Sequence, residues 1–186
     1  MLCRSSRRFL RGFVGLSAAS LLLTNCTKQA DQLEGNVLMR NNFDELAGWL
    51  GAAPQPSLTT EKAHSGHYSI KVDATTDFSI GYTKTLGQMS DRRVVKFKID
   101  AWVLVPGADA KALLVTTFGE SGAKPMKWTG FDVTKDTPTN GDWQRVSEVI
   151  EVPAVATANT IFNLYLWRTG APQPIYLDDL TVSAVQ

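Results

Sequence analysis

The chain has 186 residues, of which 44% are apolar and 20% are charged. This apolar content is enough for one packed core, so it excludes a disordered chain and removes the need for disulfide staples. The 19 basic and 18 acidic side chains nearly balance, which excludes a chain dominated by one sign of charge.

The first 26 residues have the character of a targeting segment. A basic front is followed by an apolar stretch, residues 13–23, that is too short to span a membrane and is typical of a secretory signal. The basic residues are Arg4, Arg7, Arg8 and Arg11. The segment ends in Leu23-Thr24-Asn25-Cys26, which resembles the bacterial lipobox, although Asn25 stands where a small residue is usual. A plain signal peptide cleaved nearby is the alternative.

Cysteine usage agrees with a lipid attachment point at Cys26. Cys3 and Cys26 both lie in the leader, so the mature domain has no disulfide despite an oxidising destination. Removal of the leader leaves 15 basic and 18 acidic residues, a net charge of −3. We therefore expect a cell-envelope protein, periplasmic or surface-exposed, that meets the membrane only through its anchor and does not bind nucleic acid.

Residues 27–36 are polar and predict a tether, and residues 37–186 predict one β-sandwich domain. Short runs of alternating apolar residues, separated by Gly, Pro, Asn and Asp, indicate strands. The predicted strands cover residues 68–72, 78–86, 94–105, 112–118, 127–133, 143–153, 160–168 and 174–182. Helix-period stretches are scarce beyond the leader, so the fold class is all-β.

Two further features bear on metal binding. Ser65-Gly66 marks a turn flanked by His64 and His67, whose spacing of three without a cysteine argues against a zinc site. In the last strand, Asp178 shares the period-2 face of Tyr176, Leu180 and Val182, so we expect it to point into the core. A buried carboxylate needs a partner or a metal, and calcium takes oxygen ligands. The alternative is a frayed strand end in water.

Several aromatic side chains fall on the outward faces of predicted strands. Trp102 shares such a face with Lys98 and Asp100, and Tyr165 and Trp167 share another with Asn163. Sugar rings pack their C–H faces on aromatic rings while amides and charged groups bind the hydroxyls, so these residues predict a carbohydrate site. Trp128 and Tyr82 could join from neighbouring segments. The alternative is that a loop covers these aromatics and makes a second small core.

The ordered set of motifs resembles a carbohydrate-binding module of the galactose-binding-like jelly roll, the type attached to cellulases and xylanases. The motifs are Asn42-Phe43-Asp44 with Trp49, and residues 65–72, 99–103, 142–147 and 175–180. The resemblance implies two antiparallel sheets, one of them concave and bearing the sugar platform. It also implies a structural calcium held by Asp178, Asp44 and the turn at Ser65 and Gly66.

Three functions follow from these observations. The first is non-catalytic polysaccharide binding by a lipid-anchored β-sandwich. The second is a structural or assembly lipoprotein that binds another envelope protein through the same face. The third, an enzyme, lacks support because Asp100 has no evident partner carboxylate, and the sequence contains no nucleophile elbow or phosphate-binding loop.

Overall fold

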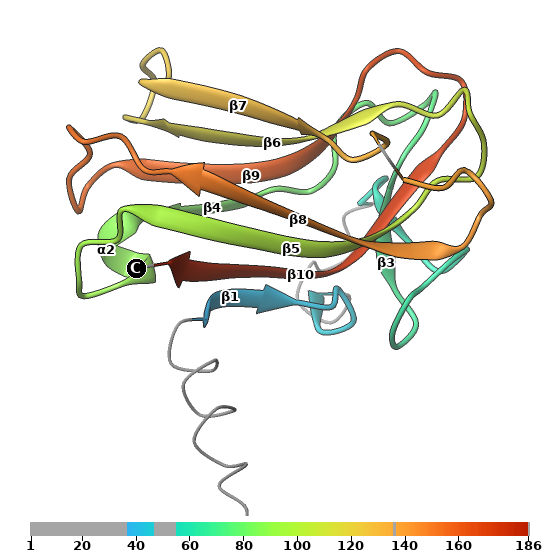
Figure 1. Ribbon diagram of the computed structural model, residues 1–186, viewed down its shortest axis with the longest axis horizontal. Coiled ribbons are helices and arrows are strands. Elements are labelled where there is room, and N and C mark those ends of the chain that lie inside the picture. Colours follow the sequence, from blue (N-terminus) through green and yellow to red (C-terminus); the bar gives the residue numbers. More distant parts are fainter. Residues whose placement is uncertain (1–36, 47–54, 136, 186) are drawn as a thin grey trace, which may run out of the picture.

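The protein folds as a β-sandwich, as the sequence predicts. A computed structural model describes residues 37–46, 55–135 and 137–185 (Figure 1). The leader, Cys26, the tether and Trp49 lie outside the described residues. The elements are β1 (Val37–Asn41), β2 (Leu58–Thr59), β3 (Ser69–Val72), β4 (Tyr82–Thr85), α2 (Leu86–Met89), β5 (Lys96–Leu104), β6 (Ala112–Gly119), β7 (Lys127–Asp132), β8 (Trp143–Glu151), β9 (Ile161–Arg168) and β10 (Ile175–Val185).

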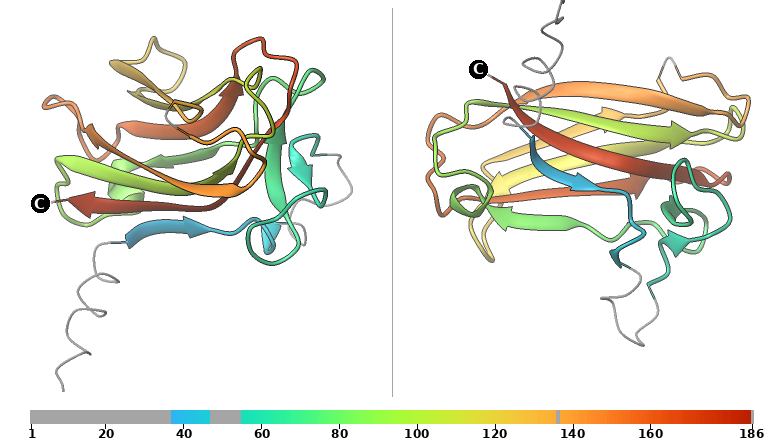
Figure 2. Two further views of the ribbon diagram at one scale, coloured as in Figure 1. Left: turned by 45° about the vertical axis from the view of Figure 1, so that its right-hand side comes forward. Right: turned by 90° about the horizontal axis from the view of Figure 1, so that it is seen from below.

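Two antiparallel sheets face each other across the core (Figure 2). The six-stranded sheet has the order β2-β3-β10-β5-β8, and β1 pairs with the later part of β10. The four-stranded sheet has the order β4-β9-β6-β7. All pairs are antiparallel, which gives the jelly-roll β-sandwich that the motifs predict.

The core is built from the inward faces of the long strands. β5 and β9 alternate between buried and partly exposed residues along most of their length, because successive side chains of a strand point to opposite sides of the sheet. Phe162 lies between the two sheets with its ring centroid 5.1 Å from that of Phe97 and 5.2 Å from that of Phe118. Phe43, of the Asn42-Phe43-Asp44 motif, is also buried.

A β-bulge in β10 changes which way Asp178 points. The register with β5 shifts between Asp178 and Thr181, and Asp179 has a φ of 47°. Asp178 lies opposite the outward-facing Trp102, whereas Val182 lies opposite the buried Ile99. The prediction that Asp178 shares a core-facing side with Leu180 and Val182 was therefore wrong, because the extra residue of the bulge reverses the alternation.

Smaller departures occur near α2. The predicted strand 78–86 ends in this short helix, whose Thr85 and Gln88 form a capping box. Val95 belongs to the predicted strand 94–105, but β5 begins one residue later and Val95 is 52% exposed. Within the described residues, no helix has the length and apolar character needed to cross a membrane.

Candidate functional site

The residues predicted to form one sugar platform lie on two different sheets. Trp102, Asp100 and Lys98 belong to β5 of the six-stranded sheet. Tyr165, Trp167 and Asn163 belong to β9 of the four-stranded sheet. Both sets point outward, so the whole sandwich separates them. The expectation of a single platform was wrong because alternation tells which side of its own strand a residue occupies, not which sheet holds the strand.

On the six-stranded sheet, the indole of Trp102 is already covered. The imidazole of His64 stacks on it with ring centroids 3.9 Å apart and an interplanar angle of 14°. The same imidazole meets Trp143 edge-on at 5.7 Å. His64 belongs to the β2–β3 loop, residues 60–68, which folds over this outer face. A ring face occupied by another side chain is closed to a sugar. On this sheet the alternative expectation therefore holds, that a loop covers the outward aromatic side chains.

The β2–β3 loop is held in place by Asp178. This residue is 0% exposed, and its carboxylate accepts three backbone N–H bonds. Oδ2 accepts from His64 at 2.8 Å and from Ser65 at 3.1 Å, and Oδ1 accepts from Asp179 at 2.7 Å. Burial raises the pKa of Asp178, while the N–H bonds act in the opposite direction.

Additional side-chain bonds tie the loop to the sheet. Asp179 receives the hydroxyl of Ser65 at 2.7 Å and contacts Nδ1 of His64 at 2.5 Å. Glu61 accepts from Lys71 at 2.7 Å and from the hydroxyl of Tyr176 at 2.8 Å. Burial, with the bond to Glu61, raises the pKa of Tyr176 to about 12. The loop is therefore fixed near its start, at Glu61, and in its middle, at His64 and Ser65.

Asp100 is also engaged on this face. Its carboxylate lies 3.1 Å from Nζ of Lys98 and 3.0 Å from Nη2 of Arg145. Only 13% of its side chain is exposed. The carboxylate of Asp100 is therefore already engaged by two cationic side chains of its own face.

The outer face of the four-stranded sheet is different, because its aromatic rings form a partly exposed group. We call Phe78, Trp128, Tyr165 and Trp167 the aromatic face. Phe78 forms a β-bridge with Trp167, and their rings lie 6.0 Å apart at 12°. Tyr165 meets Phe78 edge-on at 6.0 Å, and Trp128 meets Trp167 edge-on at 6.5 Å. Phe78 is 56% and Trp128 50% exposed.

The position of Trp128 depends on Gly130. A Cβ atom at Gly130 would lie 2.6 Å from Cη2 of Trp128 and 2.9 Å from Cδ1 of Leu113. The missing side chain at Gly130 therefore leaves the space that the indole occupies beside its neighbour Trp167.

The composition of the aromatic face differs from the sequence expectations at two residues. Tyr82 was expected on this face, but it points inward: it lies opposite the buried Leu164 and packs 6.4 Å from Phe162. Phe78 was not expected. Its bridge to Trp167 joins segments far apart in the sequence, so no local pattern could reveal it.

A polar cavity continues the aromatic face along the same sheet. It has a volume of about 340 Å³ and lies between the strands and the β6–β7 loop. Asn163 stands in its wall, where its amide donates to Thr117 at 2.9 Å and accepts from Thr83 at 2.8 Å. Exposed rings next to fixed amide and hydroxyl groups are the composition of a site for a ligand with both apolar and polar faces.

The four residues predicted to bind calcium lie around a single turn. The carboxylate of Asp44 occupies the space above Gly66, where a Cβ atom would be 1.9 Å from Oδ2. Oδ1 of Asp44 accepts the N–H of His67 at 2.7 Å, whereas the buried Oδ2 has no hydrogen-bond partner. Asp178 binds the same turn through Ser65. A buried carboxylate oxygen without a donor fits a hard cation.

The donor set is nevertheless small. In the described residues, no group of three or more His, Cys, Asp or Glu side chains is arranged to hold a metal ion. A cation here would need backbone carbonyl oxygens in addition to the two carboxylates. This is acceptable for calcium, which takes such ligands, and unsuitable for zinc.

Comparisons with known proteins identify the fold. No protein-family model matches the chain, and no curated protein matches it in sequence. Among solved structures, the CBM22-1 xylan-binding domain of Paenibacillus barcinonensis Xyn10C is 15% identical, with a TM-score of 0.51, over 81% of this chain and 96% of that domain. The CBM22-2 xylan-binding domain of the same protein is 16% identical, with a TM-score of 0.54, over 80% and 99%.

A third solved structure has the same architecture. The C-terminal family 22 carbohydrate binding module of Clostridium thermocellum Xyn10B is 13% identical, with a TM-score of 0.52, over 80% of this chain and 93% of that module. At these identities the likeness establishes a shared jelly-roll β-sandwich, and the ligand has to be argued from the residues of this chain.

Proposed function

We propose that the protein is a non-catalytic polysaccharide-binding module whose ligand lies on the aromatic face of the four-stranded sheet. The observation that carries this proposal is the aromatic face, in which Phe78 and Trp128 are exposed and Tyr165 and Trp167 half-buried, beside the polar cavity at Asn163. The similar xylan-binding modules support a glycan as the ligand, and xylan is the first polysaccharide to test.

The mechanism is stacking and hydrogen bonding without turnover. The C–H faces of successive sugar rings pack on the indoles of Trp128 and Trp167, and the hydroxyls bond to Asn163, Thr117 and Thr83. Asn163 retains unused capacity, since an amide has two donors and an oxygen that can accept twice. The rings and the amide are already in place, which reduces the ordering cost of binding.

The state of Asp100 supports a binding function rather than hydrolysis. Hydrolysis of a glycosidic bond requires two carboxyl groups on either side of the sugar. Asp100, the acid expected near the platform, belongs to the other sheet and is paired with Lys98 and Arg145. It is therefore not available to a glycan on the aromatic face.

Affinity electrophoresis in gels that contain soluble polysaccharides tests this function. We expect retardation of the wild-type protein in at least one polysaccharide gel, and its loss in the double variant Trp128→Ala/Trp167→Ala. Trp102→Ala is the matched control, since it removes an indole from the opposite face, and it should remain retarded. Equal retardation of the wild type and the double variant would exclude this site. Capture of an envelope protein, with no response to any glycan, would instead support an assembly role.

We also propose that Asp44 and Asp178 hold a structural calcium ion with carbonyl oxygens of the turn at Ser65 and Gly66. The buried Oδ2 of Asp44, which has no donor, supports this assignment. A chelator should lower the melting temperature and calcium should restore it, because a ligand that binds only the folded state stabilises it. Asp44→Asn should abolish the response. An unchanged melting temperature with no metal in elemental analysis would remove calcium and leave the glycan proposal intact.

Finally, we propose that the mature protein is anchored in the cell envelope by lipid on Cys26. The basic front, the short apolar stretch and the position of Cys26 support this proposal. Mass spectrometry of the protein from producing cells should find an acylated Cys26 as its first residue. Cys26→Ser should yield protein without lipid. An unmodified N-terminus at another position would show that a plain signal peptide is removed.

A further inference from the structure

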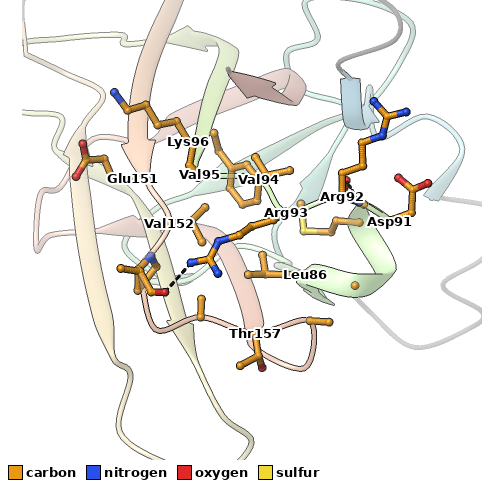
Figure 3. A pocket seen from close by; sticks show the side chains of 18 residues that line it. Leu86, Asp91, Arg92, Arg93, Val94, Val95, Lys96, Glu151, Val152 and Thr157 are labelled. Atoms are coloured by element: carbon orange, nitrogen blue, oxygen red, sulfur yellow. Dashed lines mark hydrogen bonds between the residues drawn. The ribbon is translucent and has the colours of Figure 1, made fainter.

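A second cavity lies at the end of the sandwich where α2 meets the loop that follows β8 (Figure 3). Its volume is about 460 Å³, and the aromatic face contributes none of its lining residues. Much of its wall is apolar and includes Leu86, Met89, Val94, Val152, Pro153 and Ala156. The buried Phe97 also lines it, so the cavity reaches the edge of the hydrophobic core.

The wall of this cavity is fixed by backbone hydrogen bonds. Leu86 donates its N–H to the carbonyl of Thr160 at 2.9 Å, and Gly87 donates to that of Ala158 at 2.8 Å. The capping box of Thr85 and Gln88 closes the first turn of α2. The space is therefore part of the folded structure and does not require a ligand to form it, as is usual for small-molecule sites.

One cation extends into this apolar space. The side chain of Arg93 lies across the cavity, and its Nη2 donates to the carbonyl of Ala154 at 2.6 Å, whereas Arg92 points away (Figure 3). A guanidinium has five N–H donors in a planar fork, so several remain after this bond. Within the described part of the chain, Arg93 forms no salt bridge.

The charged residues that line the cavity are three basic and two acidic ones, which leaves one positive charge in excess: Asp91, Arg92, Arg93, Lys96 and Glu151. Lys96 is the register partner of Glu151 on the adjacent strand, and Asp91 lies next to Arg92 (Figure 3). Among the basic side chains, that of Arg93 bonds to the cavity wall. Near the cavity, Val95 is 52% and Val155 74% exposed, so this end of the sandwich also presents apolar surface to solvent.

We infer that this cavity binds a single-chain amphiphile with an anionic head, of the fatty-acid class. The acyl chain lies among the apolar residues, and the carboxylate pairs with the guanidinium of Arg93, whose fork matches the two oxygens. The cavity volume is within the range of small-molecule sites. Charge selects the head group, because a cationic or neutral head leaves Arg93 beside the ligand without a partner. This inference is independent of the glycan site.

Isothermal titration calorimetry of the purified protein with dodecanoate, below its micelle concentration, tests the inference. We expect saturable 1:1 binding by the wild type. Arg93→Gln should weaken it about tenfold or more, since a charge-assisted pair is lost. Arg92→Gln is the matched control and should leave it unchanged. Ala156→Trp, which fills the cavity, should abolish binding. Dodecyltrimethylammonium, with the same chain and a cationic head, should bind about tenfold more weakly than dodecanoate.

Melting temperatures show whether each variant is folded, and Arg93→Lys, which keeps the charge, should recover part of the affinity. Retention by polysaccharide gels should be the same in Arg93→Gln as in the wild type. The proposal of an amphiphile site and the proposal of a glycan site can therefore be rejected separately. Absence of dodecanoate binding would overturn the inference. Equal effects of Arg92→Gln and Arg93→Gln, or equal affinity for the cationic amphiphile, would also overturn it.

Discussion

The two outer faces of the sandwich both carry large aromatic side chains, yet only one of them is open. On the six-stranded sheet, Trp102 lies under His64 of the β2–β3 loop, which Asp178 holds through backbone N–H groups. On the four-stranded sheet, Trp128 is half exposed beside Trp167. The comparison shows that an outward aromatic indicates a ligand site only after the loops of the fold have been placed.

The largest expected effect concerns the closed face. Asp178→Ala removes the acceptor of three backbone N–H groups, two of them in the β2–β3 loop. Leaving buried donors without partners should lower the free energy of unfolding by about 3 kcal/mol or more. Urea denaturation measures this, with Asp109→Ala, at an exposed acid, as the control. A loss no larger than that of the control would show that the loop is held in another way.

A smaller effect is expected on the open face. Gly130→Ala places a Cβ atom where Trp128 lies, so the indole must shift away from Trp167. We expect glycan affinity to fall about threefold to tenfold with little change in stability, because only the edge of the platform is disturbed. Affinity electrophoresis measures the change. Gly107→Ala is the matched control, since a Cβ atom there meets nothing within 4 Å. Unchanged affinity would mean that Trp128 is not part of the site.

The smallest expected effect is a change in how stability depends on pH, and it arises from Asp73 near the closed face. The hydroxyl and N–H of Thr75, with Lys71, lower the pKa of Asp73 to about 2 from its ordinary 3.8. Lys71 also holds Glu61 of the β2–β3 loop. Because the folded pKa is the lower one, the ionised Asp73 stabilises the fold above pH 3.8, and this contribution is lost as the pH falls towards 2.

Asp73→Asn should therefore reduce the loss of unfolding free energy between pH 5 and pH 2.5. The difference from the wild type should be about 1 kcal/mol or less, since exposed pairs are screened by solvent. Urea denaturation at the two pH values measures it, with Asp91→Asn as the exposed control. Identical pH dependence in the wild type and Asp73→Asn would contradict the assignment. Glycan binding should be the same in both at pH 5.

Local alternation was sufficient to predict most of the fold. The period-2 pattern predicted the strands that contain Phe97 and Phe162, and both residues are buried in the core. It could not tell which strands become neighbours, since pairing joins residues far apart in the sequence. For this reason Trp102 and Trp167 were assigned to one platform although β5 and β9 belong to different sheets.

The remaining errors come from local irregularities. The bulge at Asp178 and Asp179 reverses the alternation within β10, and the inward turn of Tyr82 depends on its register with β9. A pair of Asp residues in a strand is a weak signal for a bulge, because Asp tolerates positive φ better than most residues. The bridge between Phe78 and Trp167 had no sequence signal at all.

The measurement that tests the central claim most directly is the response of the indole N–H resonances of the tryptophans to a glycan titration by NMR. The signals of Trp128 and Trp167 should shift as the polysaccharide fragment saturates the protein, while those of Trp102 and Trp143 should stay in place. Shifts confined to Trp102 and Trp143 would contradict the claim, because they would put the ligand on the face that the β2–β3 loop covers.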